Sequence, residues 1–262
     1  MKLNRTLLRG VALAGLAVAA TGNATFALAG TAPQAAKTYA DTLFDQTFRE
    51  NRGVTAIRIS ATGKNGPIEV SRGKPGKGKA VTMPLHDSMG QPIGSVSLSF
   101  AGSPASASKI AARLSRRIYV SDNLVDPDPF VAGAARPRLA QAIIERMIDK
   151  HPDLVTLAMH VAPPGHDNII MASNFGRIGK LADKDDMHVI NDGAVLREVT
   201  NGGQRLAVEL PQLDRKGKVI GALSTSFLIP PGGSADAAYA KAIAVRDEIA
   251  KQTPSLEALA AK

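Results

Sequence analysis

The sequence of 262 residues contains no cysteine. This absence excludes disulfides, thiol catalysis, metal or iron–sulfur sites built on cysteine, and a lipoprotein anchor. Tryptophan is also absent and aromatic residues make up 4% of the chain, which argues against a nucleic-acid partner because bases stack on aromatic side chains. Beyond the N-terminus, no stretch is apolar over the about 20 residues that a membrane span requires. Nucleic-acid binding and membrane-spanning segments are therefore not expected.

The N-terminus carries the pattern of an export signal. Three basic residues precede an uncharged apolar run at 11–20, and an Ala-Leu-Ala tripeptide ends at Ala29. This order is typical of a signal peptide that is cleaved after the tripeptide. A retained membrane anchor is the alternative, but the apolar run is shorter than a span. We therefore expect a signal peptide over 1–29 and a periplasmic or secreted protein with no transmembrane anchor after cleavage.

Two segments of the chain are copies of one pattern. Residues 81–100 read VTMPLHDSMGQPIGSVSLSF and residues 208–227 read VELPQLDRKGKVIGALSTSF, with nine identities at an offset of 127. The identical pairs are Val81/Val208, Pro84/Pro211, Asp87/Asp214, Gly90/Gly217, Ile93/Ile220, Gly94/Gly221, Ser97/Ser224, Ser99/Ser226 and Phe100/Phe227. Each copy is two strand-like runs around a turn with Asp and Gly, which predicts a β-hairpin. The repeat indicates an internal duplication.

Weaker matches extend the duplication upstream of the hairpins. Val54 matches Val155 and Ile68 matches Ile169, both at an offset of 101. The offset then rises to 127, so the second copy holds 26 additional residues, 181–206. A segment inserted between a strand and a hairpin is expected to lie over the open face of the sheet and to enclose a pocket.

Local periodicity predicts the same order of elements twice: a helix, two strands, a hairpin and a helix. The fold class that follows is α+β, with two tandem units that each contain an antiparallel sheet flanked by helices. A segment rich in proline and aspartate is expected to link the units. The predicted divisions are a first unit at 30–120, a linker at 121–137 and a second unit at 138–262.

The repeated hairpin, with its L/MP…D…G..IG…S.S pattern at 83–100 and 210–227, and the strand and turn NIIMASNFGRIGK at 168–180 resemble the double Cache family of extracytoplasmic sensor domains. The resemblance implies PAS/Cache-like units over most of 37–250, the first of them reduced. It also implies a small polar or anionic ligand on the face of the central sheet, and a membrane receptor or kinase as the signalling partner. This sequence lacks the membrane helix, effector domain and Trp-containing ligand motif of such sensors, so a free-standing binding module is expected.

The second unit carries the candidate ligand-binding residues because it has the additional segment. Arg177 stands between two glycines, and its planar guanidinium suits a carboxylate or phosphate. His160 lies on the more polar face of the strand 155–162, and Thr225 lies in the second hairpin. An ordinary strand-exit turn and a solvated histidine are the alternatives. The full set is His160, Asn168, Ser173, Asn174, Arg177, Lys180, His188 and Thr225.

Other chemistry has less support. No metal-ligand spacing is complete, so a solvated acidic helix start near 183–190 is the alternative to a metal site. GKPGKGKA at 73–80 ends in Ala80 where a phosphate-binding loop has Ser or Thr, which favours a solvated basic loop. No G-x-S-x-G motif is present, and neither a catalytic group nor a cofactor is expected. The metal-type residues of the second unit are His160, His166, Asp167, Asp183, Asp185, Asp186 and His188.

The sequence therefore predicts an exported, non-catalytic protein that recognises a small polar or anionic ligand in its second unit. A structural or interaction protein that docks on a membrane partner is the second reading. A metal-dependent or hydrolytic periplasmic enzyme is the third.

Overall fold

The computed structural model describes residues 37–131 and 133–261. The predicted signal peptide at 1–29 therefore lies outside the described residues. Within the described ranges, no helix combines the length and apolarity that crossing a bilayer demands.

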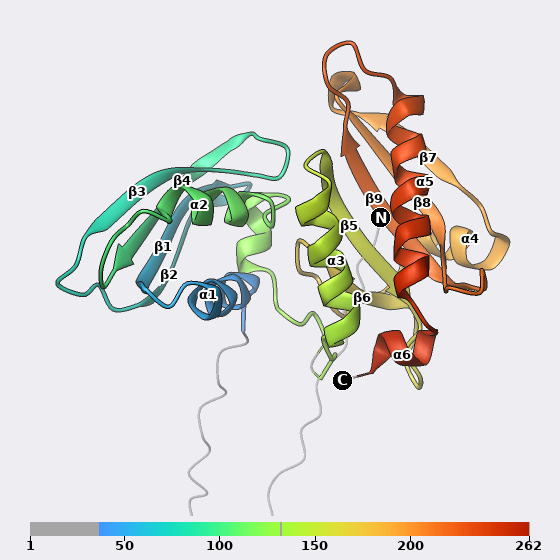
Figure 1. Ribbon diagram of the computed structural model, residues 1–262, viewed down its shortest axis with the longest axis horizontal. Helices are drawn as coiled ribbons and strands as arrows, with labels where there is room; N and C mark the ends of the chain where they lie inside the picture. Colours follow the sequence, from blue (N-terminus) through green and yellow to red (C-terminus); the bar gives the residue numbers. More distant parts are fainter. Residues whose placement is uncertain (1–36, 132, 262) are drawn as a thin grey trace, which may run out of the picture. The chain divides into compact units, whose positions relative to one another are not determined.

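The first sheet is antiparallel and has its helices on one face (Figure 1). Its strands follow the order β2-β1-β4-β3, so the hairpin pairs β1–β2 and β3–β4 each lie side by side, while β2 and β3 form the two edges. The side chains Ile57 and Ile59 point to the helices, whereas the intervening Arg58 is exposed, as strand alternation requires. The elements are α1 (Tyr39–Glu50), β1 (Val54–Gly63), β2 (Gly66–Gly73), β3 (Ala80–His86), β4 (Pro92–Phe100) and α2 (Ala107–Ser115).

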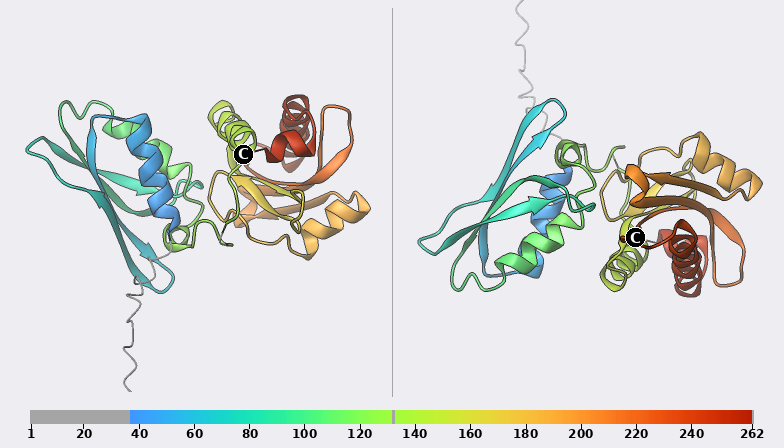
Figure 2. Two further views of the ribbon diagram at one scale, coloured as in Figure 1. Left: turned by 90° about the horizontal axis from the view of Figure 1, so that it is seen from below. Right: turned by 90° about the horizontal axis from the view of Figure 1, so that it is seen from above.

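The second sheet is also antiparallel, with the order β6-β5-β9-β8-β7. Three helices cover one of its faces and α4 lies on the opposite side (Figure 2). The predicted α+β fold of two antiparallel sheets with flanking helices is confirmed. The elements are α3 (Arg138–Lys150), β5 (Leu154–Val161), β6 (Ile169–Ser173), α4 (Lys184–Asp192), β7 (Leu196–Thr200), β8 (Arg205–Leu213), β9 (Val219–Leu228), α5 (Ala235–Gln252) and α6 (Leu256–Ala260).

The duplication is visible in strand order and in register. Without β7, the strand order of the second sheet is β6-β5-β9-β8. This order corresponds strand by strand to β2-β1-β4-β3 in the first sheet. Val54 pairs with Phe100 before a bulge, and Leu154 pairs with Phe227 before an equivalent bulge. These pairings relate β1 to β5 by an offset of 100, so the sequence match of Val54 to Val155 is wrong by one residue.

The offset between the two copies increases by one residue, from 100 to 101, in the turn that follows. Ala61 pairs with Ile68 across the β1–β2 turn, whereas Val161 pairs with Ile169 across the β5–β6 connection, which is one residue longer. The offset of 101 for Ile68 and Ile169 therefore holds. The residues counted as additional, 181–206, contain α4, β7 and the first two residues of β8.

The segment predicted as a linker, 121–137, is tied to its surroundings by backbone hydrogen bonds. It opens with the 3-10 helix η1 (Ser121–Val125), whose Leu124 is buried in the first core. The carbonyl oxygen of Asp126 accepts from the N–H of Tyr39, at 2.9 Å. The N–H of Phe130 donates to the carbonyl oxygen of Ile178, at 2.7 Å. The connection is thus ordered on both the first and the second unit.

Candidate functional site

The second sheet has one apolar and one polar face. Leu157, Val208 and Leu223 pack under α3, α5 and α6 on the apolar face. The opposite face, which we call the far face, carries the alternate residues of β5, β8 and β9. Ala158, Ser224 and Glu209 are directly paired across these strands, and directly paired residues share a face. The far face is therefore a surface of small and polar side chains beside the inserted segment. Its members are Thr156, Ala158 and His160 on β5, Ala222, Ser224 and Ser226 on β9, and Arg205, Ala207, Glu209 and Pro211 on β8.

Helix α4 is held on the far face mainly by one carboxylate. Its N-cap Asp183 accepts hydrogen bonds from the N–H groups of Asp185 and Asp186, which fixes the first turn. The Asp186 carboxylate accepts from the N–H of Asp183 at 3.0 Å and from the hydroxyl of Ser224 at 3.2 Å. Asp186 and Val189 are the buried residues of this helix, so a polar contact accounts for much of its attachment to the sheet.

His160 lies beneath the same carboxylate. Its Nδ1 atom is 2.9 Å from Oδ2 of Asp186, and both side chains are buried. The approach is oblique, because Nδ1 forms no directed hydrogen bond within the described residues. Burial alone would raise the pKa of Asp186, but the contact with His160 and the hydrogen bonds from the Asp183 N–H and Ser224 outweigh it and lower that pKa. Asp186 is thus held as a carboxylate against the strand.

The same surroundings raise the pKa of Glu209, whereas that of Asp186 is lowered. Burial is the main reason that the pKa of Glu209 rises to about 7, and the nearby carboxylates of Asp186, Asp183 and Asp185 raise it further. One of its carboxyl oxygens, Oε2, is buried and has no hydrogen-bond partner within the described residues. The carboxyl of Glu209 therefore exchanges its proton near neutral pH, where an ordinary glutamate is already ionised.

The other end of the far face is filled by packed side chains. Arg205 donates to the hydroxyl of Tyr119 at 2.6 Å and to the hydroxyl of Ser226 at 2.7 Å. The guanidinium also stacks over the Tyr119 ring, whose centroid is 5.1 Å away, and Phe175 packs against that ring. These contacts cover the far face at the start of β8, and α4 covers it at the other end of that strand.

A hollow of about 360 Å³ borders the α4 end of the far face. Ile190 contributes to its wall from the inserted segment, and Asn168 contributes from the residue before β6. Lys218, in the β8–β9 turn, and Ser255, before α6, add polar groups. The volume falls within the range of small-molecule sites in proteins, about 300–1,000 Å³. Its complete lining is Ala162, Asn168, Ile190, Asp214, Lys218, Val219, Ile220, Gly221, Ser255, Leu256 and Glu257.

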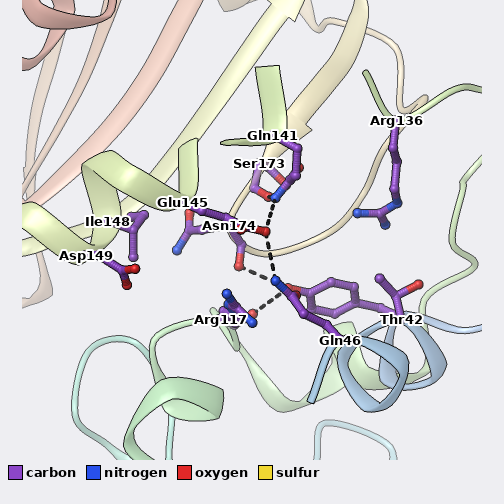
Figure 3. A pocket seen from close by; sticks show the side chains of 11 residues that line it. Thr42, Gln46, Arg117, Arg136, Gln141, Glu145, Ile148, Asp149, Ser173 and Asn174 are labelled. Atoms are coloured by element: carbon purple, nitrogen blue, oxygen red, sulfur yellow. Dashed lines mark hydrogen bonds between the residues drawn. The ribbon is translucent and has the colours of Figure 1, made fainter. Parts of the chain in front are cut away.

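A second polar hollow lies around Tyr39 and is too small for an organic ligand (Figure 3). Its volume of about 20 Å³ is close to the space that one water molecule needs. The hydroxyl of Tyr39 lies 2.9 Å from the carbonyl oxygen of Arg117 and 3.0 Å from that of Asn174. Full burial raises the pKa of Tyr39, so the phenol stays neutral and serves as a donor. This hollow belongs to the packing of the fold.

The candidate residues of the sequence do not converge on one site. His160 lies under α4 and Asn168 lines the hollow of 360 Å³, two features of the same end of the second sheet. Ser173 and Asn174 instead line the small hollow in Figure 3. The Asn174 amide accepts from the N–H of Leu157 at 2.8 Å and donates to the carbonyl oxygens of Val155 and Arg116, both at 3.0 Å. The Asn174 side chain is therefore hydrogen-bonded to backbone groups of the protein on both its oxygen and its nitrogen.

The remaining candidates lie on turns, on the exposed side of α4 or on the helix-covered face of the sheet. Arg177 adopts a left-handed backbone with φ 62°, and its Nε donates to Asp126 at 3.4 Å. Lys180 is exposed, and His188 is exposed beside Asp192 at 2.6 Å. Thr225 lies on the helix face, opposite His160, and its hydroxyl donates to the carbonyl oxygen of Val208 at 3.1 Å. Ser224 is the hairpin residue that shares the far face with His160.

Sequence reasoning missed Glu209, Ser224 and the anchoring role of Asp186. Alternation along 205–213 would have placed Glu209 opposite the buried Val208 and Leu210. Ser224 matches Ser97 in the duplicated hairpin, and a residue shared by both copies indicates sheet structure rather than a ligand site. Within residues 37–131 and 133–261, no group of three or more His, Asp or Glu side chains is arranged to hold a metal ion.

No protein-family model and no curated protein sequence matches this chain. Among solved structures, it is similar to a domain from a transcriptional regulator described as a member of the IclR family. The sequence identity is 10%, the match covers 48% of this chain and 94% of that chain, and the TM-score is 0.23. A likeness at this TM-score carries no argument about function.

Proposed function

We propose that this protein is an exported, non-catalytic module that binds a small polar molecule at the α4 end of its second sheet. The observation that supports it is the hollow of about 360 Å³ between Ile190 of the inserted segment and Asn168. Both the double Cache resemblance and the inserted segment point to this unit. The first unit, which has no counterpart of 181–206, would serve as a platform.

The lining of the hollow favours a ligand with hydrogen-bonding groups and one acidic group. The Lys218 ammonium is the cation that an acidic group would meet, and the Asn168 amide can both donate and accept. Asp214 is already occupied, because its carboxylate accepts from the N–H groups of Lys216 and Lys218 in the hairpin turn. The ligand class that follows is a small carboxylate or a similarly polar acid.

Helix α4 supplies a means of linking occupancy to conformation. Ile190 lines the hollow, while Asp186 of the same helix is attached to His160 and Ser224 on the sheet. A ligand that contacts Ile190 and the turn together would favour the closed position of α4, since a ligand stabilises the state that it binds better.

The proposal is tested by thermal unfolding with a panel of small polar metabolites, chiefly carboxylates. A ligand at about 100 times its Kd stabilises the folded state by about 2.7 kcal/mol, which is measurable as a higher Tm. We expect Lys218→Gln or Asn168→Ala to remove the increase. Lys216→Gln, in the same turn but outside the lining, is the matched control and should keep it. An increase that survives both site variants would contradict this location.

The alternative is an interaction protein without a small ligand that docks on a membrane receptor. It would show no Tm increase with any compound, and a membrane protein would be recovered with it from the envelope of the source cell. A signalling receptor or kinase as the partner of the ligand-bound form is part of the first proposal, and its capture would depend on the ligand.

A further inference from the structure

The positive charge of the chain is concentrated in the first unit. Residues 37–120 contain 13 Lys and Arg against 5 Asp and Glu, a net charge of +8. Residues 121–262 contain 16 Lys and Arg against 18 Asp and Glu, a net charge of −2. The net charge of the whole chain is therefore carried mainly by the first unit. Such an uneven charge distribution favours binding of a polyanionic partner to that unit.

Five cations gather at one end of the first sheet, which we call the basic end. The topology brings them together, because β1 begins where β2 and β4 end and where α2 starts. Each of the five is exposed and forms no ion pair within the described residues. The basic end consists of Arg52, Lys74, Lys77, Lys79 and Lys109.

The loop that presents three of these lysines is pinned to the sheet. The N–H of Lys74 donates to the carbonyl oxygen of Thr55 at 3.2 Å, and the carbonyl oxygen of Lys79 accepts from the N–H of Phe100 at 3.0 Å. A Cβ on Gly78 would lie 1.8 Å from the carbonyl oxygen of Phe100, and one on Gly73 would lie 2.2 Å from that of Thr55. Glycine is therefore required at both positions for the loop to lie this close, and the two ends of the loop backbone are held against the sheet.

The acidic residues nearby are already paired with other cations. Glu50 lies 2.9 Å from Arg113, and Asp45 lies 2.8 Å from Arg72. The charge of the basic end is thus not neutralised by its own neighbours. A surface of this kind attracts phosphate groups from outside the chain.

We infer that the basic end docks the protein on the surface of an anionic phospholipid bilayer. The exposed large apolar side chains of the described residues lie elsewhere, among them Val125, Val131 and Val199, so the apolar centre of a typical protein interface is missing. Aromatic residues are absent from 71–80, so bases have no stacking surface there. A group of exposed lysines without apolar or aromatic neighbours suits lipid headgroups, where each cation strengthens binding about fivefold.

The test is co-sedimentation of the purified protein with vesicles of phosphatidylcholine that contain about 30% phosphatidylglycerol, since only the second lipid is anionic. We expect binding to these vesicles and not to pure phosphatidylcholine, with loss of binding as salt rises from about 0.05 to 0.5 M. The triple variant Lys74→Gln, Lys77→Gln, Lys79→Gln should bind about a hundredfold more weakly.

The matched control removes three exposed cations from the second unit: Arg215→Gln, Lys216→Gln and Lys251→Gln. It has the same net charge as the first triple variant and should bind nearly as well as the unaltered protein. Equal losses in the two variants, or no dependence on phosphatidylglycerol, would overturn the inference. So would tighter binding to a single-stranded oligonucleotide than to the vesicles, or release by a few millimolar inorganic phosphate at constant ionic strength. None of these outcomes depends on the proposed ligand site.

Discussion

The Oδ2 atom of Asp186 lies 2.9 Å from Nδ1 of His160, and this contact joins the inserted segment to β5 of the second sheet. The same carboxylate accepts from Ser224 on the neighbouring strand. Three elements that are distant in the sequence thus meet at one buried negative charge. The position of α4, and with it the wall of the proposed site, depends on this meeting point.

Asp186→Asn should loosen α4 from the sheet. The variant replaces one acceptor oxygen by an NH₂ group that faces donors, so we expect a loss of about 2–3 kcal/mol in the free energy of unfolding. Chemical denaturation measures it. Asp192→Asn is the control, because Asp192 contacts only the exposed His188 and an exposed pair contributes less than about 1 kcal/mol. Equal losses for both variants would contradict the anchoring role of Asp186.

Glu209→Gln should be most stabilising at high pH. The pKa of Glu209 is about 7 in the folded protein against 4.5 for the ordinary carboxyl, so the folded state binds the proton more tightly. The contribution of Glu209 to the free energy of unfolding is therefore greatest below pH 4.5 and is lost as pH rises through 7. The fall should be about 1–2 kcal/mol after allowance for partial exposure. Denaturation at pH 5 and pH 8 measures it, and the glutamine variant should lose this part of the dependence.

The pH dependence should also respond to Asp186. The negative charge of Asp186 is one cause of the raised pKa of Glu209, so Asp186→Asn should lower that pKa and flatten the slope between pH 5 and pH 8. An unchanged slope in this variant, with a normal slope in the parent, would show that the two carboxyls do not interact.

Asn174→Ala should be strongly destabilising although the residue is outside the proposed site. The substitution leaves the N–H of Leu157 and the carbonyl oxygens of Val155 and Arg116 without their amide partner. We expect a loss of about 2–4 kcal/mol, measured by thermal or chemical unfolding. Asn65→Ala, in the exposed β1–β2 turn, should change stability by less than about 0.5 kcal/mol. Loss of ligand-dependent stabilisation without loss of folding would instead assign Asn174 to recognition.

Gly221→Ala should disturb the pairing of β5 with β9. A Cβ at Gly221 would lie 2.2 Å from the carbonyl oxygen of His160, and the duplicated Gly94 stands in the same relation to Ser60 at 2.0 Å. Each substitution forces the strands apart and should cost more than about 2 kcal/mol. Gly53→Ala meets nothing within 4 Å and has no positive φ, so it should be nearly neutral. A neutral Gly221→Ala would show that the two strands are not closely paired there.

The hairpins were predictable because their signal is local. Pairs such as Gly94/Gly221 and Phe100/Phe227 lie in strands joined by tight turns, and identity at those positions reflects one geometry repeated. The predicted alignment of the upstream strand was off by one residue, because Val is followed by Thr in both copies and matching these pairs gives the wrong offset. The bulge that sets the true register cannot be recognised in the sequence. The one-residue shift matters, since each residue then faces the other side of the sheet.

The polar site was only half predictable. His160 could be placed on the less apolar face of its strand, and 181–206 could be recognised as additional. Nothing local indicated that Asp186 would turn inward from an exposed acidic helix start, or that Thr225 would face the helices while Ser224 faced His160. These outcomes depend on pairing between strands about 65 residues apart in the chain.

The central claim is that a small polar molecule occupies the hollow beside α4. Mass spectrometry of the molecules released from the protein, purified from its source cell, is the direct test. We expect one small polar acid in near-stoichiometric amount, present with Lys216→Gln and lost with Asn168→Ala and Lys218→Gln combined. A molecule retained by that double variant, or no bound molecule together with no Tm increase from any polar acid, would contradict it.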